Sequence, residues 1–148
     1  MNVSKINTNQ LNFDKSPDGL LPAIIQDANT RVVLMQGYMN REALDKTLDT
    51  KLVTFFSRSK QRLWTKGETR KNHLHFVSAA ADCDQDSILV QAHPNGPTCQ
   101  SGVDTCWGDV NQCEFLNHLE RSIQHRRANP SDDSYTTQLL THVINTDA

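Results

Sequence analysis

The chain has 148 residues, enough for one domain with its own core, and its apolar fraction of 36% is low for a compact monomer. A net charge of −2 without a basic patch argues against nucleic-acid binding, and no apolar stretch approaches the ~20 residues that span a bilayer. The polar N-terminus lacks the apolar core of a signal peptide, so we expect a cytoplasmic protein that acts neither on nucleic acid nor in a membrane.

The predicted elements are mostly short strands. Residues 1–18 are predicted to form a mobile arm that ends in a turn at Pro17-Asp18-Gly19. Asn40 is expected to cap a helix through Leu48, and apolar residues at helical spacing predict a second helix between Phe115 and Ile123. Stretches that are apolar or rich in β-branched residues are predicted to be strands. These stretches are residues 21–25, 31–35, 53–56, 74–78 and 87–92.

Two stretches are predicted to lack regular structure. Residues 93–108 are rich in Pro, Gly, Asn and Thr and are typical of a loop, whereas residues 126–133 are typical of a linker. We therefore place the main domain at residues 19–125, after the arm. Residues 126–148 are expected to form a linker and a short amphipathic tail, too small to be a domain.

Cysteines give the first chemical signal. Cys83, Cys99 and Cys106 lie in turn-like surroundings, separated by 16 and then 7 residues. In a cytosolic enzyme, spaced cysteines are more typical of metal ligands than of disulfides. Three thiolates and a water suit a catalytic zinc ion, which keeps one position open. The spacing is not the close pair of a structural zinc site, and buried apolar cysteines are the alternative. Cys113 falls in the second helix and is predicted to be a core thiol.

Aspartates alternate with other residues around Cys83. In an extended backbone, Asp82, Asp84 and Asp86 would point to one side and Cys83 to the other. Carboxylates that face one way repel one another unless a cation separates them, and Mg²⁺ is a natural partner for such oxygens. A solvated acidic turn is the alternative. The interleaved pattern predicts a soft-metal ligand, Cys83, on one side of the segment and a hard-metal site, made by the aspartates, on the other.

Residues 57–71 are the most basic part of the chain, with six Lys or Arg. Arg binds phosphates in bidentate fashion and Lys as a point charge, while Trp64 offers a face on which a base can stack. A solvated charged loop and a core tryptophan are the alternatives. Beside a zinc-type site, this block favours a nucleotide substrate and hydrolytic chemistry. The predicted substrate-binding residues are Arg58, Ser59, Arg62, Trp64, Lys66 and Glu68.

Several long motifs occur in the order found in a known family. They are VLMQGYMNREAL (33–44), FSRSKQRLWTKGET (56–69), DCDQD (82–86), GPTC (96–99) and CWG (106–108). On these motifs the chain resembles the phosphoribosyl-AMP cyclohydrolases over residues 20–108, about 60% of its length. Several long motifs in the right order are specific, unlike a single short pattern.

The resemblance implies a fold, a reaction and a set of ligands. The implied fold is α+β, a mainly antiparallel β-sheet with a few flanking helices, in a single domain that forms an intertwined homodimer. The implied reaction is hydrolysis, by zinc-activated water, of the N1–C6 bond of the adenine ring of 1-(5-phosphoribosyl)-AMP, a step of L-histidine biosynthesis. The implied zinc ligands, shared between two subunits, are Cys83, Cys99 and Cys106. The implied magnesium ligands are Asp82, Asp84 and Asp86.

The sequence departs from the family pattern at two places. The family usually carries a histidine directly after the second cysteine, but here Gln100 follows Cys99. Glutamine can hydrogen-bond a water or the ring but does not titrate, so we expect weakened or lost turnover unless a histidine such as His73 substitutes. Residues 134–139 resemble the start of the phosphoribosyl-ATP pyrophosphohydrolase domain that is fused to some family members. The rest of that domain is absent, so residues 126–148 are expected to be its remnant, without pyrophosphohydrolase activity.

Three alternatives stay open. The first is a catalytically impaired paralogue that binds nucleotide and metal, which Gln100 favours. The second is a zinc deaminase, against which the absence of His-x-Glu and Pro-Cys-x-x-Cys segments argues. The third is a structural zinc protein, in which Cys113 would be the fourth ligand.

Overall fold

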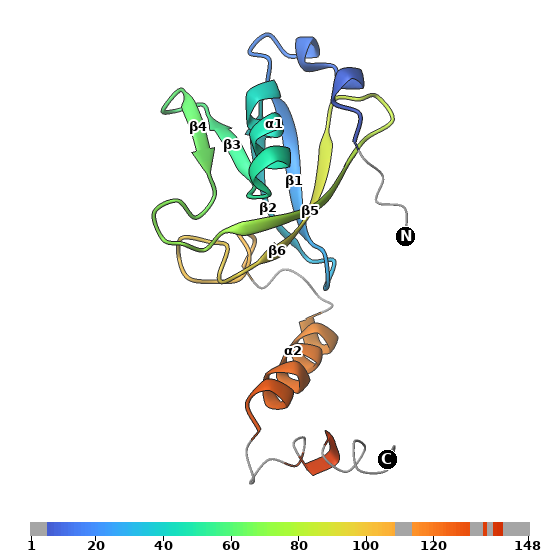
Figure 1. Ribbon diagram of the computed structural model, residues 1–148, viewed down its shortest axis with the longest axis vertical. Helices are drawn as coiled ribbons and strands as arrows, with labels where there is room; N and C mark the ends of the chain where they lie inside the picture. Colours follow the sequence, from blue (N-terminus) through green and yellow to red (C-terminus); the bar gives the residue numbers. More distant parts are fainter. Residues whose placement is uncertain (1–5, 109–113, 131–134, 136–137, 141–148) are drawn as a thin grey trace. The chain divides into compact units, whose positions relative to one another are not determined.

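The computed structural model describes residues 6–108, 114–130, 135 and 138–140. These residues belong to two compact units, which divide between residues 108 and 109. The first unit contains both sheets, one helix and every motif that carries the family resemblance (Figure 1). The second unit contains the other helix.

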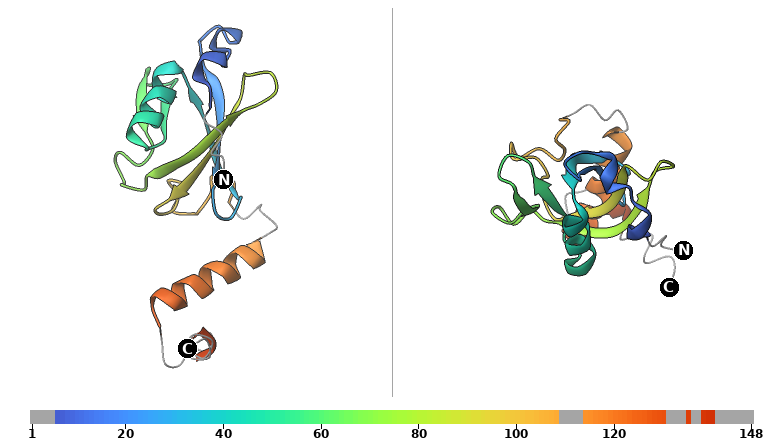
Figure 2. Two further views of the ribbon diagram at one scale, coloured as in Figure 1. Left: turned by 45° about the vertical axis from the view of Figure 1, so that its right-hand side comes forward. Right: turned by 90° about the horizontal axis from the view of Figure 1, so that it is seen from above.

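Six strands of the first unit form two sheets (Figures 1 and 2). In the larger sheet, in spatial order, lie β2 (Val33–Met39), β1 (Leu21–Asp27), β6 (Ile88–Pro94) and β5 (Leu74–Ala81). The smaller sheet is a hairpin of β3 (Thr54–Ser57) and β4 (Arg62–Thr65). Strands β1 and β6 run parallel, while the other three pairs are antiparallel. This confirms the predicted α+β fold with a mainly antiparallel sheet and few helices.

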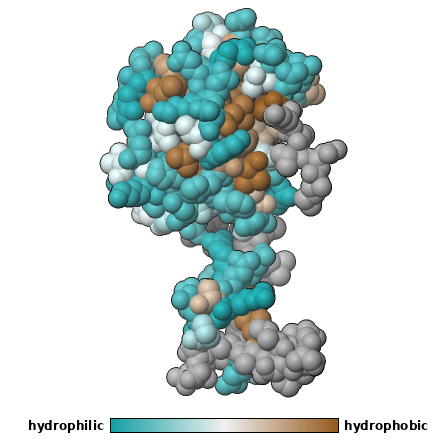
Figure 3. Space-filling model, in the orientation of Figure 1, coloured by the Kyte–Doolittle hydropathy of each residue, from teal (hydrophilic) through white to brown (hydrophobic). Residues whose placement is uncertain are grey.

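Alternation along the strands places the core on one face of the larger sheet. In β1, Ala23 and Ile25 are fully buried, whereas Ile24 between them is 36% exposed. Strand β6 repeats the pattern, with Val90 buried and Leu89 39% exposed. A period of two puts Ile24 and Leu89, which are paired in register, together on the opposite face. That face therefore carries apolar side chains that the first unit leaves partly exposed. Figure 3 shows hydrophobic patches among mainly hydrophilic residues on the surface in view.

Helix α1 (Arg41–Thr50) begins where the sequence predicts. The Asn40 side chain accepts a hydrogen bond from the backbone N–H of Ala43 at 2.8 Å, which satisfies one of the free donors at the helix start. Ala43 and Leu44 are buried, and the helix packs against β2, β3 and β4. It ends at Thr50, and the capping residue Lys51 has a left-handed backbone with a φ of 61°. The helix thereby joins the larger sheet to the hairpin that carries much of the basic block.

The N-terminal segment differs from its prediction. Two short 3-10 turns, Thr8–Gln10 and Phe13–Lys15, precede β1. Leu11 and Phe13 are only 5% and 7% exposed and belong to the core. The prediction of a mobile arm is therefore wrong for this part of the segment, because burial of two large apolar side chains ties it to the domain.

Two strands also differ from their predictions. Strand β2 begins at Val33 rather than at residue 31, because Arg31 has a left-handed backbone with a φ of 65° and belongs to the preceding turn. Strand β4 falls inside the basic block, where no strand was predicted. Its pairing with β3 sets Trp64 opposite Phe55, with ring centroids 5.7 Å apart. This aromatic contact holds a charged segment in a strand.

The second unit contains α2 (Glu114–Ala128), the helix predicted near Phe115 to Ile123. It extends to Ala128, past the predicted start of the linker at residue 126, and its basic last turn suits the negative end of the helix dipole. Cys113, predicted to be a core thiol, and most of the C-terminal tail lie outside the described residues. The boundaries of the main domain stay a prediction. Within the part of the chain that the structure describes, no helix has the length and apolar character needed to cross a membrane.

Candidate active site

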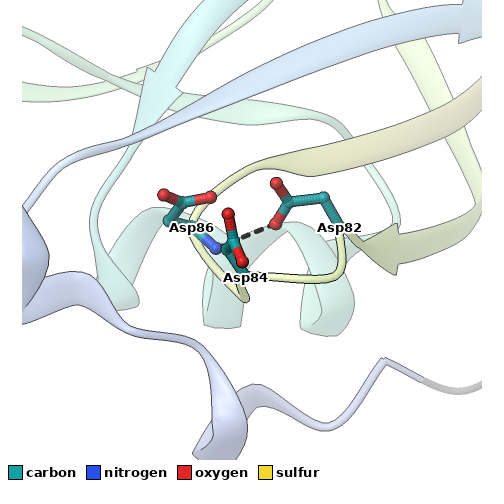
Figure 4. A group of neighbouring side chains, drawn as sticks. All are labelled: Asp82, Asp84 and Asp86. Carbon is teal, nitrogen blue, oxygen red and sulfur yellow. Dashed lines mark hydrogen bonds between the residues drawn. The ribbon is translucent and has the colours of Figure 1, made fainter.

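The three aspartates of the acidic motif lie together in the turn between β5 and β6 (Figure 4). One carboxylate oxygen from each of Asp82, Asp84 and Asp86 lies within 4.8 Å of the others. The backbone here forms a turn, whereas an extended backbone was predicted. Gln85 has a φ of 60°, and its N–H donates to the carbonyl of Asp82 at 3.1 Å. A tight turn, and not strand alternation, brings the carboxylates together.

Backbone donors and a lysine already engage part of this cluster. One oxygen of Asp82 accepts the N–H groups of Asp86 and Ser87, at 3.0 and 3.2 Å (Figure 4 shows the first). The Lys15 ammonium forms an ion pair with Asp86. The Lys15 hydrogen bond holds the pKa of Asp86 below its usual range. Asp86 makes the largest contribution to raising the pKa of Lys15. The charges of Asp84 and Asp82 raise it further. Lys15 is thus a cation placed beside three carboxylates that could otherwise hold a divalent metal.

Replacing Lys15 with methionine is expected to tighten divalent-cation binding at the aspartates about three- to fivefold, the size expected for a half-exposed ion pair. The substitution removes a competing charge, while the backbone bond from Asn12 N–H to the Gln85 carbonyl, at 2.8 Å, still holds the segment in place. Titration with Mn²⁺, followed by the loss of its free electron paramagnetic resonance signal, measures the affinity. Lys15→Arg keeps the charge and serves as the control. Equal affinities for all three proteins would contradict the competition.

Two of the predicted zinc ligands lie side by side in the loop after β6. Cys99 and Cys106 lie near enough for each to affect the pKa of the other. The Ser101 hydroxyl donates to Cys99 Sγ at 3.1 Å and lowers the pKa of that thiol. Burial, followed by the charge of Cys99, raises the pKa of Cys106. Of the two thiols, Cys99 therefore ionises more readily, and the thiolate is the form that binds a metal.

The third cysteine lies elsewhere. Cys83 is exposed in the β5–β6 turn, at the end of β6 opposite to the loop with Cys99 (Figure 1). Strand β6 has seven residues, so it separates the two by roughly 20 Å. Among the described residues, the aspartates are the only group of three or more His, Cys, Asp or Glu whose ligand atoms converge. A single chain therefore brings together two of the three cysteines, and not all three.

A pocket of about 190 Å³ lies beside Cys99. Its lining residues are Trp64, residues 66–70, Asn72 and residues 97–100. Lys66 is buried, with its ammonium 5.4 Å from the centre of the Trp64 ring. Arg62 does not line the pocket but pairs with Glu68 at 2.6 Å and holds the pKa of that carboxyl below its usual range. Three of the six predicted substrate-binding residues thus reach this pocket, and a fourth orients one of them.

The two candidates for proton transfer, Gln100 and His73, differ in whether they line the pocket. Gln100 lines the pocket, and its backbone carbonyl accepts a hydrogen bond from the guanidinium of Arg70. His73 is half-buried and does not line the pocket, and its ring centre lies 6.5 Å from that of His75. None of the described residues around this pocket is a histidine. The structure therefore brings Gln100 to the site but not His73.

A second, more open pocket of about 520 Å³ lies between β2 and the β3–β4 hairpin. We call it the groove; its lining residues are 35–38, 55–59 and Trp64. Arg58 lies over the ring of Tyr38, 4.0 Å from its centre. Arg58 and Ser59 were predicted to bind substrate, but Tyr38 and the pocket residue Thr98 were not. Their position inside two family motifs was the signal available in the sequence.

Comparison with known proteins identifies the family. The family described as phosphoribosyl-AMP cyclohydrolase (PRA-CH) matches residues 35–108, half of the chain. The histidine biosynthesis bifunctional protein HisIE of Bacteroides thetaiotaomicron is 55% identical over 138 residues, which are 92% of this chain and 68% of that protein. HisIE of Escherichia coli strain K12 is 53% identical over 131 residues, or 88% of this chain and 64% of that protein.

A third relative, HisIE of Shewanella oneidensis, is 52% identical over 137 residues, or 93% of this chain and 64% of its own length. The chain thus spans about two thirds of the length of these relatives. The match covers the basic block, the acidic turn and the loop with Cys99 and Cys106. These findings confirm the family and the enzyme class that the motifs predicted. The chain belongs to the phosphoribosyl-AMP cyclohydrolase family of hydrolases.

Proposed function

We propose that the chain hydrolyses the N1–C6 bond of the adenine ring of 1-(5-phosphoribosyl)-AMP, a step of L-histidine biosynthesis, in the cytoplasm. The observation that carries this proposal is the close pair Cys99 and Cys106 beside a pocket with Trp64 and Lys66, in a chain of this family. Soft thiolates fit zinc. When bound, zinc would lower the pKa of a water molecule to ~7 and so supply the nucleophile near neutral pH.

The side chains of the pocket have separate roles in this proposal. Trp64 presents an aromatic face to the purine, and the buried ammonium of Lys66 offers a charge to the substrate phosphates. Gln100 can hydrogen-bond the ring or a water but cannot carry a proton at neutral pH. The carboxylates of the acidic turn suit Mg²⁺, a hard cation that prefers oxygen ligands.

We further propose that the zinc site is shared between two copies of the chain in a homodimer. Cys83 is exposed and about a strand length away from the Cys99–Cys106 pair, so a site of three thiolates needs Cys83 from a second chain. Exposed Ile24 and Leu89 lie in register on the uncovered face of the larger sheet. Contiguous exposed apolar side chains of this kind favour burial against another protein surface.

A second candidate is a catalytically impaired member of the family that keeps nucleotide and metal binding. The observation that favours it is Gln100, which lines the pocket beside Cys99 in the place where the family usually has a histidine. No histidine among the described residues lines the pocket in its stead. The two candidates differ in turnover but not in binding.

Turnover of phosphoribosyl-AMP with Zn²⁺ and Mg²⁺, followed by the ultraviolet change as the purine ring opens, tests the proposal. We expect slow turnover by the natural chain. Gln100→His is expected to raise kcat by roughly 10- to 100-fold, because a group that titrates near pH 7 can transfer the proton that glutamine cannot. Gln100→Asn, which keeps an amide, is the control and should bring no gain.

The outcomes separate the two candidates. Turnover by the natural chain supports the cyclohydrolase. Turnover only in Gln100→His supports the impaired member. If both proteins stay inactive while zinc is bound, the proposed reaction is wrong for this chain.

A further inference from the structure

The pocket beside Cys99 is too small for the whole of the proposed substrate. Its volume of about 190 Å³ lies below the roughly 300–1,000 Å³ of typical small-molecule sites. The substrate of the proposed function is an adenine that carries two phosphoribosyl arms, one on N1 and one on N9. A site for it must hold a purine and two separate phosphates, so part of the substrate must lie outside this pocket.

The groove adjoins the pocket through a shared residue. Trp64 lines both, and the volume of the groove, about 520 Å³, lies within the range of ligand sites. Gly37 forms part of the groove, where a Cβ atom would come within 2.5 Å of the Phe55 ring. Glycine at this position therefore lets Phe55 pack behind Trp64 while the groove stays open. A ligand centred on Trp64 can extend to both sides.

The polar groups of the groove suit a phosphate. The central guanidinium carbon of Arg58 lies over the Tyr38 ring, 4.0 Å from its centre, and the hydroxyls of Ser57 and Ser59 lie 3.4 Å apart. Arginine binds phosphate oxygens in bidentate fashion, and hydroxyls add further donors. Within the described parts of the chain, the ion pairs engage Lys15 and Arg62 but not Arg58, whose charge acts only at longer range, as the last of the causes that lower the pKa of Asp18. Its donors are therefore available to an anionic ligand.

We propose that the substrate straddles Trp64, with one 5-phosphoribosyl arm in the groove and its phosphate on Arg58 and Ser59. The purine then lies on the Trp64 side facing the pocket, with its reacting carbon toward Cys99. This assignment rests on the proposed function for the identity of the substrate. The binding of a sugar phosphate in the groove does not depend on the proposed function, because it is inferred from Arg58 and Ser59 of the groove itself.

Arg58→Met tests the assignment, because it removes the charge and keeps much of the aliphatic stem. With phosphoribosyl-AMP, KM is expected to rise roughly 10- to 100-fold and kcat to change less than about threefold. This pattern is expected when a substitution removes an interaction that is equally strong in the ground state and in the transition state. Lys60→Met is the matched control, since Lys60 lies in the same turn but does not line the groove. Its KM should stay within about twofold of that of the natural chain.

Binding of D-ribose 5-phosphate, followed by chemical shifts of the backbone amides of residues 57–59, gives a readout without turnover. We expect shifts in the natural chain and in Lys60→Met, and none in Arg58→Met. Ser59→Ala, expected to weaken this binding about threefold, covers the case in which Arg58→Met does not fold. Ribose 5-phosphate binding without turnover would contradict the proposed reaction but support the groove.

Other outcomes overturn the groove assignment. One is turnover with an unchanged KM in Arg58→Met, which would leave the proposed reaction intact. Another is an equal rise of KM in Lys60→Met, which would show that general surface charge, and not the groove, attracts the substrate.

Discussion

Replacing Cys99 with serine is expected to remove zinc from the protein and to lower turnover by more than about 10⁴-fold, since unassisted water has a pKa of 15.7 and supplies almost no hydroxide at neutral pH. Cys99 is the thiol of the pair whose pKa lies below its usual range, because the Ser101 hydroxyl donates to its sulfur at 3.1 Å and the backbone of Ser101 adds to this effect. Serine keeps the size of the side chain but does not ionise near neutral pH. Zinc content by mass spectrometry and turnover of phosphoribosyl-AMP measure the two effects.

Cys113→Ser is the control for this prediction. A catalytic site made of Cys99, Cys106 and a third thiolate should keep its zinc when Cys113 is replaced. Loss of zinc in Cys113→Ser would instead favour the structural site with four protein ligands. If Cys99→Ser retains one zinc ion per chain and its full activity, the assignment of Cys99 as a ligand is wrong.

The strands that could be predicted from the sequence are those whose apolar pattern matches their burial. In β1 and β6, buried and exposed residues alternate, and the predicted ranges overlap the observed ones. Strand β4 was not predicted because it is only four residues long, lies within a basic segment, and owes its conformation to a tertiary contact of Trp64 with Phe55. The burial of Leu11 and Phe13 was not predicted either, because two isolated apolar residues form no periodic pattern.

The sequence motifs select the candidate residues of the site but not their geometry. They select the aspartates and the cysteines as candidate ligands, yet the aspartates meet through a tight turn at Gln85, whose left-handed backbone has no strong sequence signal. The distance between Cys83 and Cys99 depends on β6, which lies between them in the chain and runs the length of the sheet. The strand predicted at residues 87–92 already lies between the two cysteines in the chain, but the length of the separation follows from the seven residues of the observed β6.

Mixing two inactive variants is expected to restore activity if the zinc site is shared between subunits. Cys83→Ser and Cys99→Ser should each be inactive alone. In a heterodimer of the two, one site combines intact Cys99 and Cys106 of one subunit with the partner's Cys83, while the other site carries both substitutions. Random reassociation makes half of the dimers mixed, so about a quarter of the sites are intact, given twofold symmetry. Turnover after mixing through mild, reversible denaturation measures this fraction.

The matched control is a mixture of Cys99→Ser and Cys106→Ser. These two residues lie side by side in one chain, so every site in their heterodimer lacks one of them and no activity should return. Recovery in the first mixture but not in the second requires that Cys83 act across the interface, because a site within one chain would lose a ligand in every subunit. Two different affinity tags show whether heterodimers form. If they form in the first mixture but remain inactive, the shared site is contradicted. That result would require a rearrangement of β6 or its flanking loops to bring Cys83 to the pair within one chain, which the antiparallel pairing of β5 with β6 opposes.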